Sequence, residues 1–246
     1  MAEHALDWLP QQNKQFLLDN KASFLYGTEL PDSNQVPDGI GDTTKHHIYF
    51  FANGSVQDDT AAVRARDEFL KAVDFYKVGN YAQAAKQLGV VAHYIADVAV
   101  FGHVMGASTA WGTETHHSDY ETYVQDRTGS YESEFNSFLV FDGSLSAVSA
   151  YDAALKLAND TTFDLDGDLT CVWMDQHYNW NDATFKNRCG ESLNLAVNLI
   201  ADMLHFFYNE AIPEFPAWII LPLLMIATLF AITLKKKLIR ATSQEL

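Results

Sequence analysis

The sequence contains very little cysteine, with only Cys171 and Cys189 among 246 residues. Two thiols cannot build a four-cysteine zinc site, and neither stands at a zinc-finger spacing from a pair of histidines. Disulfides persist outside the cell, whereas inside it these residues would be free thiols. Because the C-terminal segment predicts an outward-facing domain, as argued below, we expect Cys171 and Cys189 to form a disulfide.

Basic residues are also scarce, since 16 lysines and arginines stand against 32 aspartates and glutamates, for a net charge of −16. So acidic a surface repels polyanions, and no nucleic-acid partner bound through a basic surface is expected. Hydrophobic residues still make up 48% of the chain. That share is enough for a sizeable core, so the chain is not predicted to be disordered.

The sequence lacks alternating apolar and polar runs long enough to form a sheet. Helical periodicity dominates and predicts an all-α fold. Helices are expected over 11–26, 58–79, 80–101, 114–127, 144–159 and 190–210, and loops over 31–45 and 160–188. In the second loop, DLDGDLT resembles a calcium loop, but its glycine comes too early and no glutamate stands at the twelfth position, which favours a solvated turn.

Histidines and acids are concentrated in one short segment, which holds four of the nine histidines. On a helix His93 and Asp97 are neighbours on one face, where both side chains could bind the same ion. His117 and Glu121 repeat this spacing on the following helix. A single such pair is usually a surface hydrogen bond, whereas two pairs in one segment favour a metal site.

A further histidine connects the two pairs. His103 lies six positions after Asp97, where a continuous helix would turn it away, but Gly102 lets the chain break and return. Imidazole and carboxylate groups without thiolate suit zinc and, less selectively, iron or manganese. His116 is expected to stand beside the site without binding the ion. The histidines at 4, 177 and 205 show no paired spacing and are read as structural.

The pattern H-x3-D-x5-H-x13-H-x3-E, read from His93 to Glu121, resembles the zinc-dependent phospholipase C family in every interval. The preceding NYAQAAKQLGVVAHYIAD is similar to the helix that leads into the ligands of that family. The resemblance implies a multi-helix bundle that binds two to three Zn²⁺ ions and hydrolyses phospholipid head groups. The S1/P1 nucleases share the fold but end on aspartate after a longer gap, so the match favours the phospholipases.

The family has two further ligands upstream, an aspartate in a PD segment and a later histidine, for which this chain offers Pro31-Asp32 and His46-His47. We prefer His47 because two bulky residues follow it, as they follow the family histidine. The resemblance also makes Asp32 the general base. The implied ligands are Asp32, His47, His93 and Asp97 for one zinc, and His103, His117 and Glu121 for another.

Other interpretations stay open. In the family an N-terminal tryptophan and a nearby histidine hold a third zinc, and by resemblance that segment would lie upstream of Met1. A surface or interaction module that kept the fold but lost catalysis is therefore the main alternative. A di-iron bundle needs two Glu-x-x-His motifs, and only Glu114-Thr-His-His117 is present.

The C-terminal segment contains an uncharged apolar run of 18 residues, from Ala217 to Leu234, near the lower limit for crossing a bilayer. Three lysines follow at 235–237 and would hold the C-terminus in the cytoplasm. The sequence therefore predicts a domain over 1–212 that faces outward and a single-pass membrane anchor within 213–246.

Two further features bear on the membrane anchor and on how the domain would be exported. Pro213-Glu214-Phe215, with the span and lysines that follow, resembles the PEF-CTERM sorting signals of archaeal surface proteins, which implies an archaeosortase partner. The first sixteen residues have neither a basic n-region nor an apolar h-region. Either the C-terminal span acts as the insertion signal or the sequence begins late.

Overall fold

The computed structural model describes residues 1–33, 41–42, 44–128 and 134–211. Residues 1–211 form one compact unit. Among the helices of the described residues, none is both long and apolar enough to cross a membrane. The predicted span over 217–234 and the PEF motif lie outside the described residues.

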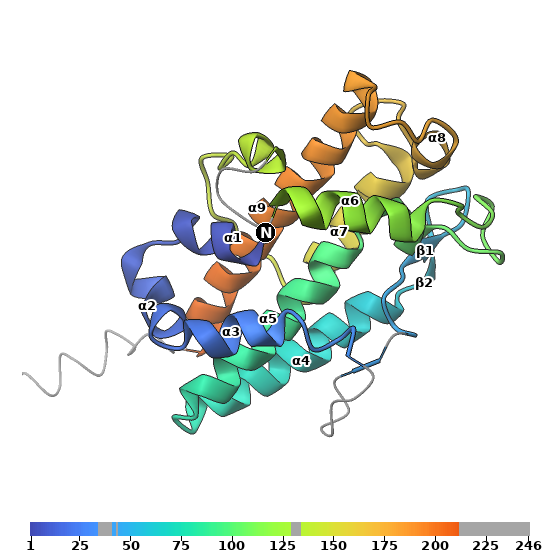
Figure 1. The fold of residues 1–246 in the computed structure, drawn as a ribbon. Helices are drawn as coiled ribbons and strands as arrows, with labels where there is room; N and C mark the ends of the chain where they lie inside the picture. The colour runs from blue at the N-terminus through green and yellow to red at the C-terminus, as the bar shows by residue number, and fades with distance from the viewer. Residues whose placement is uncertain (34–40, 43, 129–133, 212–246) are drawn as a thin grey trace, which may run out of the picture. The chain divides into compact units, whose positions relative to one another are not determined.

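Helices make up nearly all of the regular structure (Figure 1). The α-helices are α1 (Ala2–Trp8), α2 (Gln11–Asp19), α3 (Lys21–Gly27), α4 (Thr60–Lys77), α5 (Tyr81–Asp97), α6 (His117–Thr128), α7 (Ala150–Phe163), α8 (Cys171–Gln176) and α9 (Ala183–Ala211), and the short 3-10 helices are η1 (Phe101–Val104) and η2 (Phe135–Phe138). For the described residues the all-α prediction is confirmed, apart from one small hairpin. Its strands are β1 (Tyr49–Phe50) and β2 (Val56–Asp58), which pair antiparallel.

Several predicted boundaries are wrong for local reasons. The expected helix over 11–26 is two helices, because Asn20 leaves the helical conformation and its side chain donates to the carbonyl of Phe16 at 2.8 Å. The expected loop over 160–188 contains α8 and the start of α9. The hairpin escaped prediction because strands of two and three residues are too short to show an alternating pattern.

The DLDGDLT segment is the predicted turn, and Asp166 and Asp168 are exposed to solvent, but its first aspartate is not. Asp160 and Asp164 are buried and face the buried guanidinium of Arg188, which reaches Asp160 Oδ2 at 3.0 Å and Asp164 Oδ1 at 3.5 Å. Arg188 Nη2 also donates to the carbonyl of Asp160 at 2.7 Å. Arg188 of α9 therefore supplies the positive charge that compensates these two buried carboxylates.

The predicted disulfide is wrong. Cys171, at the start of α8, and Cys189, inside α9, are both free and buried. Cys189 is instead paired with the hydroxyl of Tyr120, and burial raises the pKa of each thiol to about 12. The prediction failed because it rested on the cell compartment, whereas a disulfide also requires the packing to bring the two sulfur atoms within bonding distance.

Helix α5 is held against α3 by direct contact between backbones. A Cβ added at Gly89 of α5 would lie 2.0 Å from the carbonyl oxygen of Phe24, and one at Gly27 of α3 would lie 2.0 Å from the carbonyl oxygen of Lys86. Only glycine permits so close an approach. The contact brings Thr28, the residue after α3, beside the last turns of α5.

Replacing Gly89 tests this contact. Gly89→Ala should lower the free energy of unfolding by about 1–3 kcal/mol or more, because a backbone atom cannot rotate away from the new methyl group. It should do so although alanine is the better helix former by about 1 kcal/mol. Urea unfolding followed by circular dichroism measures the change.

Gly190→Ala in α9 is the matched control. There the added methyl group would meet the ring of Phe138, a side chain that can move, so the loss of stability should be smaller. A Gly89→Ala protein as stable as the wild type would contradict the close packing of α3 on α5.

Candidate metal centre

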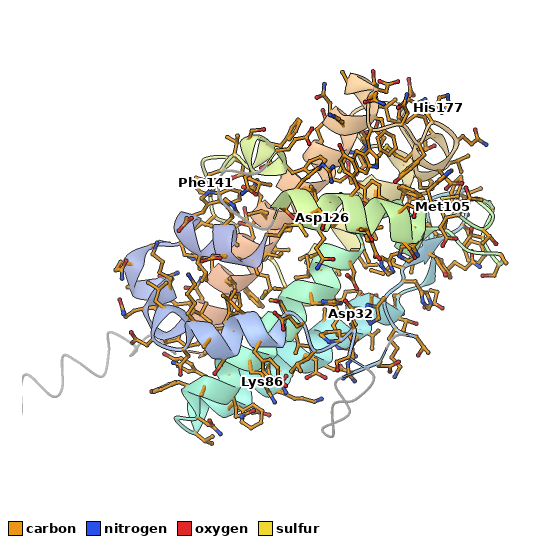
Figure 2. The ribbon with its side chains drawn as sticks, viewed as in Figure 1. Asp32, Lys86, Met105, Asp126, Phe141 and His177 are labelled. Carbon is orange, nitrogen blue, oxygen red and sulfur yellow. The ribbon has the colours of Figure 1, made fainter. Side chains whose placement is uncertain are left out.

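The end of α5 and two upstream loops bring four ligand groups together, here called the Asp32 group: Asp32, His46, His93 and Asp97. His93 and Asp97 share one face of α5, with Nε2 and Oδ2 3.0 Å apart. Asp32, after α3, lies 3.6 Å from His93 Nε2 and 3.7 Å from His46 Nδ1. His46 Nδ1 is in hydrogen-bonding contact with Asp97 Oδ2. Figure 2 shows Asp32 in the loop that follows α3.

The tautomer of His93 indicates that this group is built for a cation. His93 Nδ1 donates to the carbonyl oxygen of Thr28 at 2.7 Å. In a neutral imidazole the lone pair then sits on Nε2 and faces the carboxylate of Asp97 at 3.0 Å. Two electron-rich atoms at that separation repel each other unless a proton or a metal ion lies between them. The nitrogen and oxygen donors fit zinc, and the Thr28 contact is the support that metal-binding histidines usually have.

A second set of ligands, here called the Glu121 group, consists of His103, His117 and Glu121. Nε2 of His103 lies 3.0 Å from Oε1 of Glu121 and 3.1 Å from Nε2 of His117, and His117 Nε2 lies 3.0 Å from the same carboxylate oxygen. Three donor atoms about 3 Å apart could together hold one zinc ion, which binds nitrogen and oxygen ligands at roughly 2.0–2.2 Å.

Two residues outside the predicted ligand set position His117. Glu114 Oε1 accepts a hydrogen bond from His117 Nδ1 at 3.2 Å, which leaves Nε2 to face the Glu121 group. A Cβ at Gly102 would lie 2.7 Å from the ring of His117. The sequence does hold a signal for Glu114, because it stands three residues before His117 as in a Glu-x-x-His motif.

The structure places His46, and not His47, in the Asp32 group. His46 is buried, whereas His47 Nε2 lies 3.2 Å from Asp58 Oδ2 and its ring stacks on Tyr49. Burial alternates along residues 46–50, with His46 on the buried side and His47 on the half-exposed side. We therefore replace His47 with His46 as the candidate ligand. His116 faces Asp175 of α8 at 3.1 Å rather than either group.

The two groups lie side by side. The rings of His46 and His103 stack with their centroids 6.0 Å apart. A cavity of about 280 Å³ is lined by His93, Asp97 and Glu121, with apolar side chains of α5 and α6. A second, of about 360 Å³, is lined by His46, His103 and His117. Because each cavity contacts ligands of both groups, a molecule bound there would meet both.

Without a bound metal, protons supply the positive charge of the centre. Burial disfavours a charged imidazole at His93, but the Asp97 carboxylate outweighs it and raises the pKa of His93 to about 9. The hydrogen bond to Glu121 raises the pKa of His117. Despite burial, His103 and His117 lower the pKa of Glu121 to about 2, and His93 and His103 lower the pKa of Asp97.

Zinc binding should therefore release protons. At about pH 7 the metal-free His93 is protonated, because its pKa is about 9, while zinc takes only the neutral ring. Apparent zinc affinity should rise as the pH increases toward 9 and level off above it. Calorimetric titration in buffers of different ionisation enthalpy counts the protons. A heat that does not depend on the buffer at about pH 7 would contradict the protonated centre.

Neighbouring histidines provide a matched pair of variants for the ligand set. His46→Ala removes a ligand of the Asp32 group and should strip most of the zinc from that group. His47→Ala, one residue away, should leave the zinc content close to that of the wild type, since His47 contacts Asp58 instead. Metal analysis after dialysis distinguishes the two. Full zinc content in His46→Ala, or loss of zinc in His47→Ala only, would favour His47 as the ligand instead.

Comparison with known proteins identifies the family of this chain. The zinc dependent phospholipase C family model matches residues 1–170. Among solved structures, the alpha toxin from Clostridium absonum superposes with a TM-score of 0.56 at 17% identity, over 87% of this chain and 63% of that one. The chain thus spans less than two thirds of the toxin, and the likeness supports the fold alone. A search of curated proteins found no match. Since the family model covers well over half of its residues, the chain belongs to the zinc-dependent phospholipase C family.

Proposed function

We propose that the chain is a zinc-dependent phosphodiesterase that removes phospholipid head groups. The observation that carries the proposal is that the Asp32 group and the Glu121 group lie beside each other, with the rings of His46 and His103 in contact. Both groups line the same two cavities. Zinc follows from the family, and the two groups support at least two ions per chain. Phosphodiester cleavage by paired cations is the chemistry that such an arrangement serves.

The protein residues hold the reacting groups in place. Asp32, His46, His93 and Asp97 would hold one ion and His103, His117 and Glu121 the other. When bound, zinc lowers the pKa of a water molecule and offsets the charge of the phosphate. Asp32 is the most exposed ligand, with 69% of its side chain accessible. It can therefore accept a proton from the attacking water as well as bind metal, which supports its role as general base.

Three other readings are weaker. A di-iron bundle needs a second Glu-x-x-His motif, and Glu114 of the available one is occupied in positioning His117. A nuclease of the S1/P1 type would have to bind a polyanion with a chain of net charge −16. The non-catalytic surface module remains the main competitor, and it predicts no turnover even when both ligand groups hold zinc.

The cellular location forms part of the proposal. The apolar composition of residues 217–234 and the lysines at 235–237 support a single-pass anchor with a cytoplasmic C-terminus. The catalytic unit would then lie outside the cell membrane. The PEF motif at 213–215 supports processing by an archaeosortase.

Hydrolysis of a soluble chromogenic phosphocholine ester tests the activity. Zinc-loaded protein should turn over the ester, and chelation should abolish turnover. Asp32→Asn keeps an oxygen ligand but cannot take a proton, so kcat should fall roughly 10²–10⁴-fold with most of the zinc retained. Zinc-loaded wild-type protein without any turnover would favour the non-catalytic module, and two irons per chain would favour the di-iron bundle.

A further inference from the structure

The β1–β2 hairpin exposes two large apolar side chains close to its tip. Phe51 is 50% and Val56 42% exposed to solvent. Leu165, 61% exposed, lies across a shallow hollow from Ala52 and Gly54 at the tip of the hairpin. One exposed apolar residue needs no explanation, but several at one place indicate a contact surface.

The hairpin is tied to the loop that precedes α6. Gln57 Nε2 donates to the carbonyl oxygen of Ser108 at 2.9 Å. The hydroxyl of Tyr49 lies against Gly106, where a Cβ would come within 2.7 Å of its oxygen. Figure 1 shows hairpin and loop together near the start of α6. We call residues 49–57 and 105–113 the rim.

The rim borders the cavity of the metal centre. Tyr49, Gly106 and Thr113 line the cavity of about 360 Å³ that His46 and His103 also line. The connection is short, because the backbone N–H of Ile48, just before β1, donates to the carbonyl oxygen of His103 at 3.1 Å. Phe51 and Val56 thus lie on the segment that directly follows the ligand His46. Figure 2 labels Met105, at the start of the rim loop, beside α6.

The rim is uncharged although the chain is strongly acidic. Residues 49–57 and 105–113 contain no aspartate, glutamate, lysine or arginine, whereas charged residues make up 20% of the whole sequence. Charged side chains resist transfer into a lipid interface, while aliphatic and aromatic side chains gain free energy there. An acidic protein that must approach a bilayer would exclude carboxylates from the surface that touches it.

We propose that the rim docks on a phospholipid bilayer, with Phe51 and Val56 entering the interface and the adjoining cavity receiving a head group. This inference rests on the proposed function, because it places the substrate in a membrane. Zwitterionic bilayers should be preferred over anionic ones, since the net charge of −16 repels anionic lipid.

A fluorophore attached to the rim tests docking directly. Phe51→Cys is labelled with an environment-sensitive dye in the full chain, and native Cys171 and Cys189 should not react because they are buried. Val78→Cys is the control: Val78 is 77% exposed but lies at the α4–α5 turn, at the other end of α5 from the metal centre. The dye reports only its own surroundings, so a C-terminal anchor does not confuse the result.

On addition of phosphatidylcholine vesicles, the dye at position 51 should shift to the blue and brighten several-fold, and the dye at position 78 should not change. Phosphatidylglycerol vesicles should give a smaller response at low salt. A response at position 78 alone, at both positions equally, or at neither would overturn the inference. So would a response at position 51 to a partner protein but not to vesicles.

Activity separates this inference from the proposed function. The double variant Phe51→Ser, Val56→Ser should hydrolyse the soluble phosphocholine ester like the wild type and lose roughly tenfold on phosphatidylcholine vesicles. Equal loss on both substrates, or none on vesicles, would refute docking through the rim. A wild type inactive on both would contradict the proposed function, and the dye measurement would then decide docking alone.

Discussion

The carboxylate of Asp97 imposes the constraint on which the centre depends. Only 16% of its side chain is exposed, and it lies within hydrogen-bonding distance of the imidazoles of His46 and His93. A carboxylate so far removed from water must be compensated by positive charge. Because the Thr28 carbonyl fixes the proton of His93 on Nδ1, the compensation between His93 and Asp97 must come from an additional proton or from a metal ion. The need for a cation is therefore built into the folded chain.

The scaffold meets this constraint through close backbone contacts. Gly27 and Gly89 let α3 lie directly on α5, which brings the Thr28 carbonyl to His93. Gly102 similarly leaves room for the ring of His117, whose other nitrogen is held by Glu114. Larger side chains at these glycines would move the residues that hold the histidines, even though the glycines bind no ion. The geometry of the centre is thus set by packing one step away from the ligands.

Whether a feature could be predicted from the sequence depends on how far apart along the chain its contributing residues lie. The pairs at positions 93 and 97 and at positions 117 and 121 were predictable, because helical spacing is local. The choice between His46 and His47 depends on which side of an extended segment faces inward. Burial alternates from His46 through Ile48 to Phe50 in the structure, but His47 and Tyr49 between them are aromatic as well, so the sequence shows no contrast between the two sides. The absent disulfide and the hairpin could not be read from spacing, since both depend on contacts between distant segments.

The acidic residues that line the two cavities explain why metal should bind before the substrate does. The cavities are lined by the carboxylates of Asp97, Glu114 and Glu121, and neither has a lysine or arginine among its described lining residues. A phosphodiester entering a metal-free centre would meet these carboxylates beside protonated imidazoles. Divalent ions reverse the sign of the local potential, so the acids that repel phosphate then act by holding the charge that attracts it. Under the proposed function, metal loading would be the step that makes this acidic centre selective for an anionic group carried by a neutral surface.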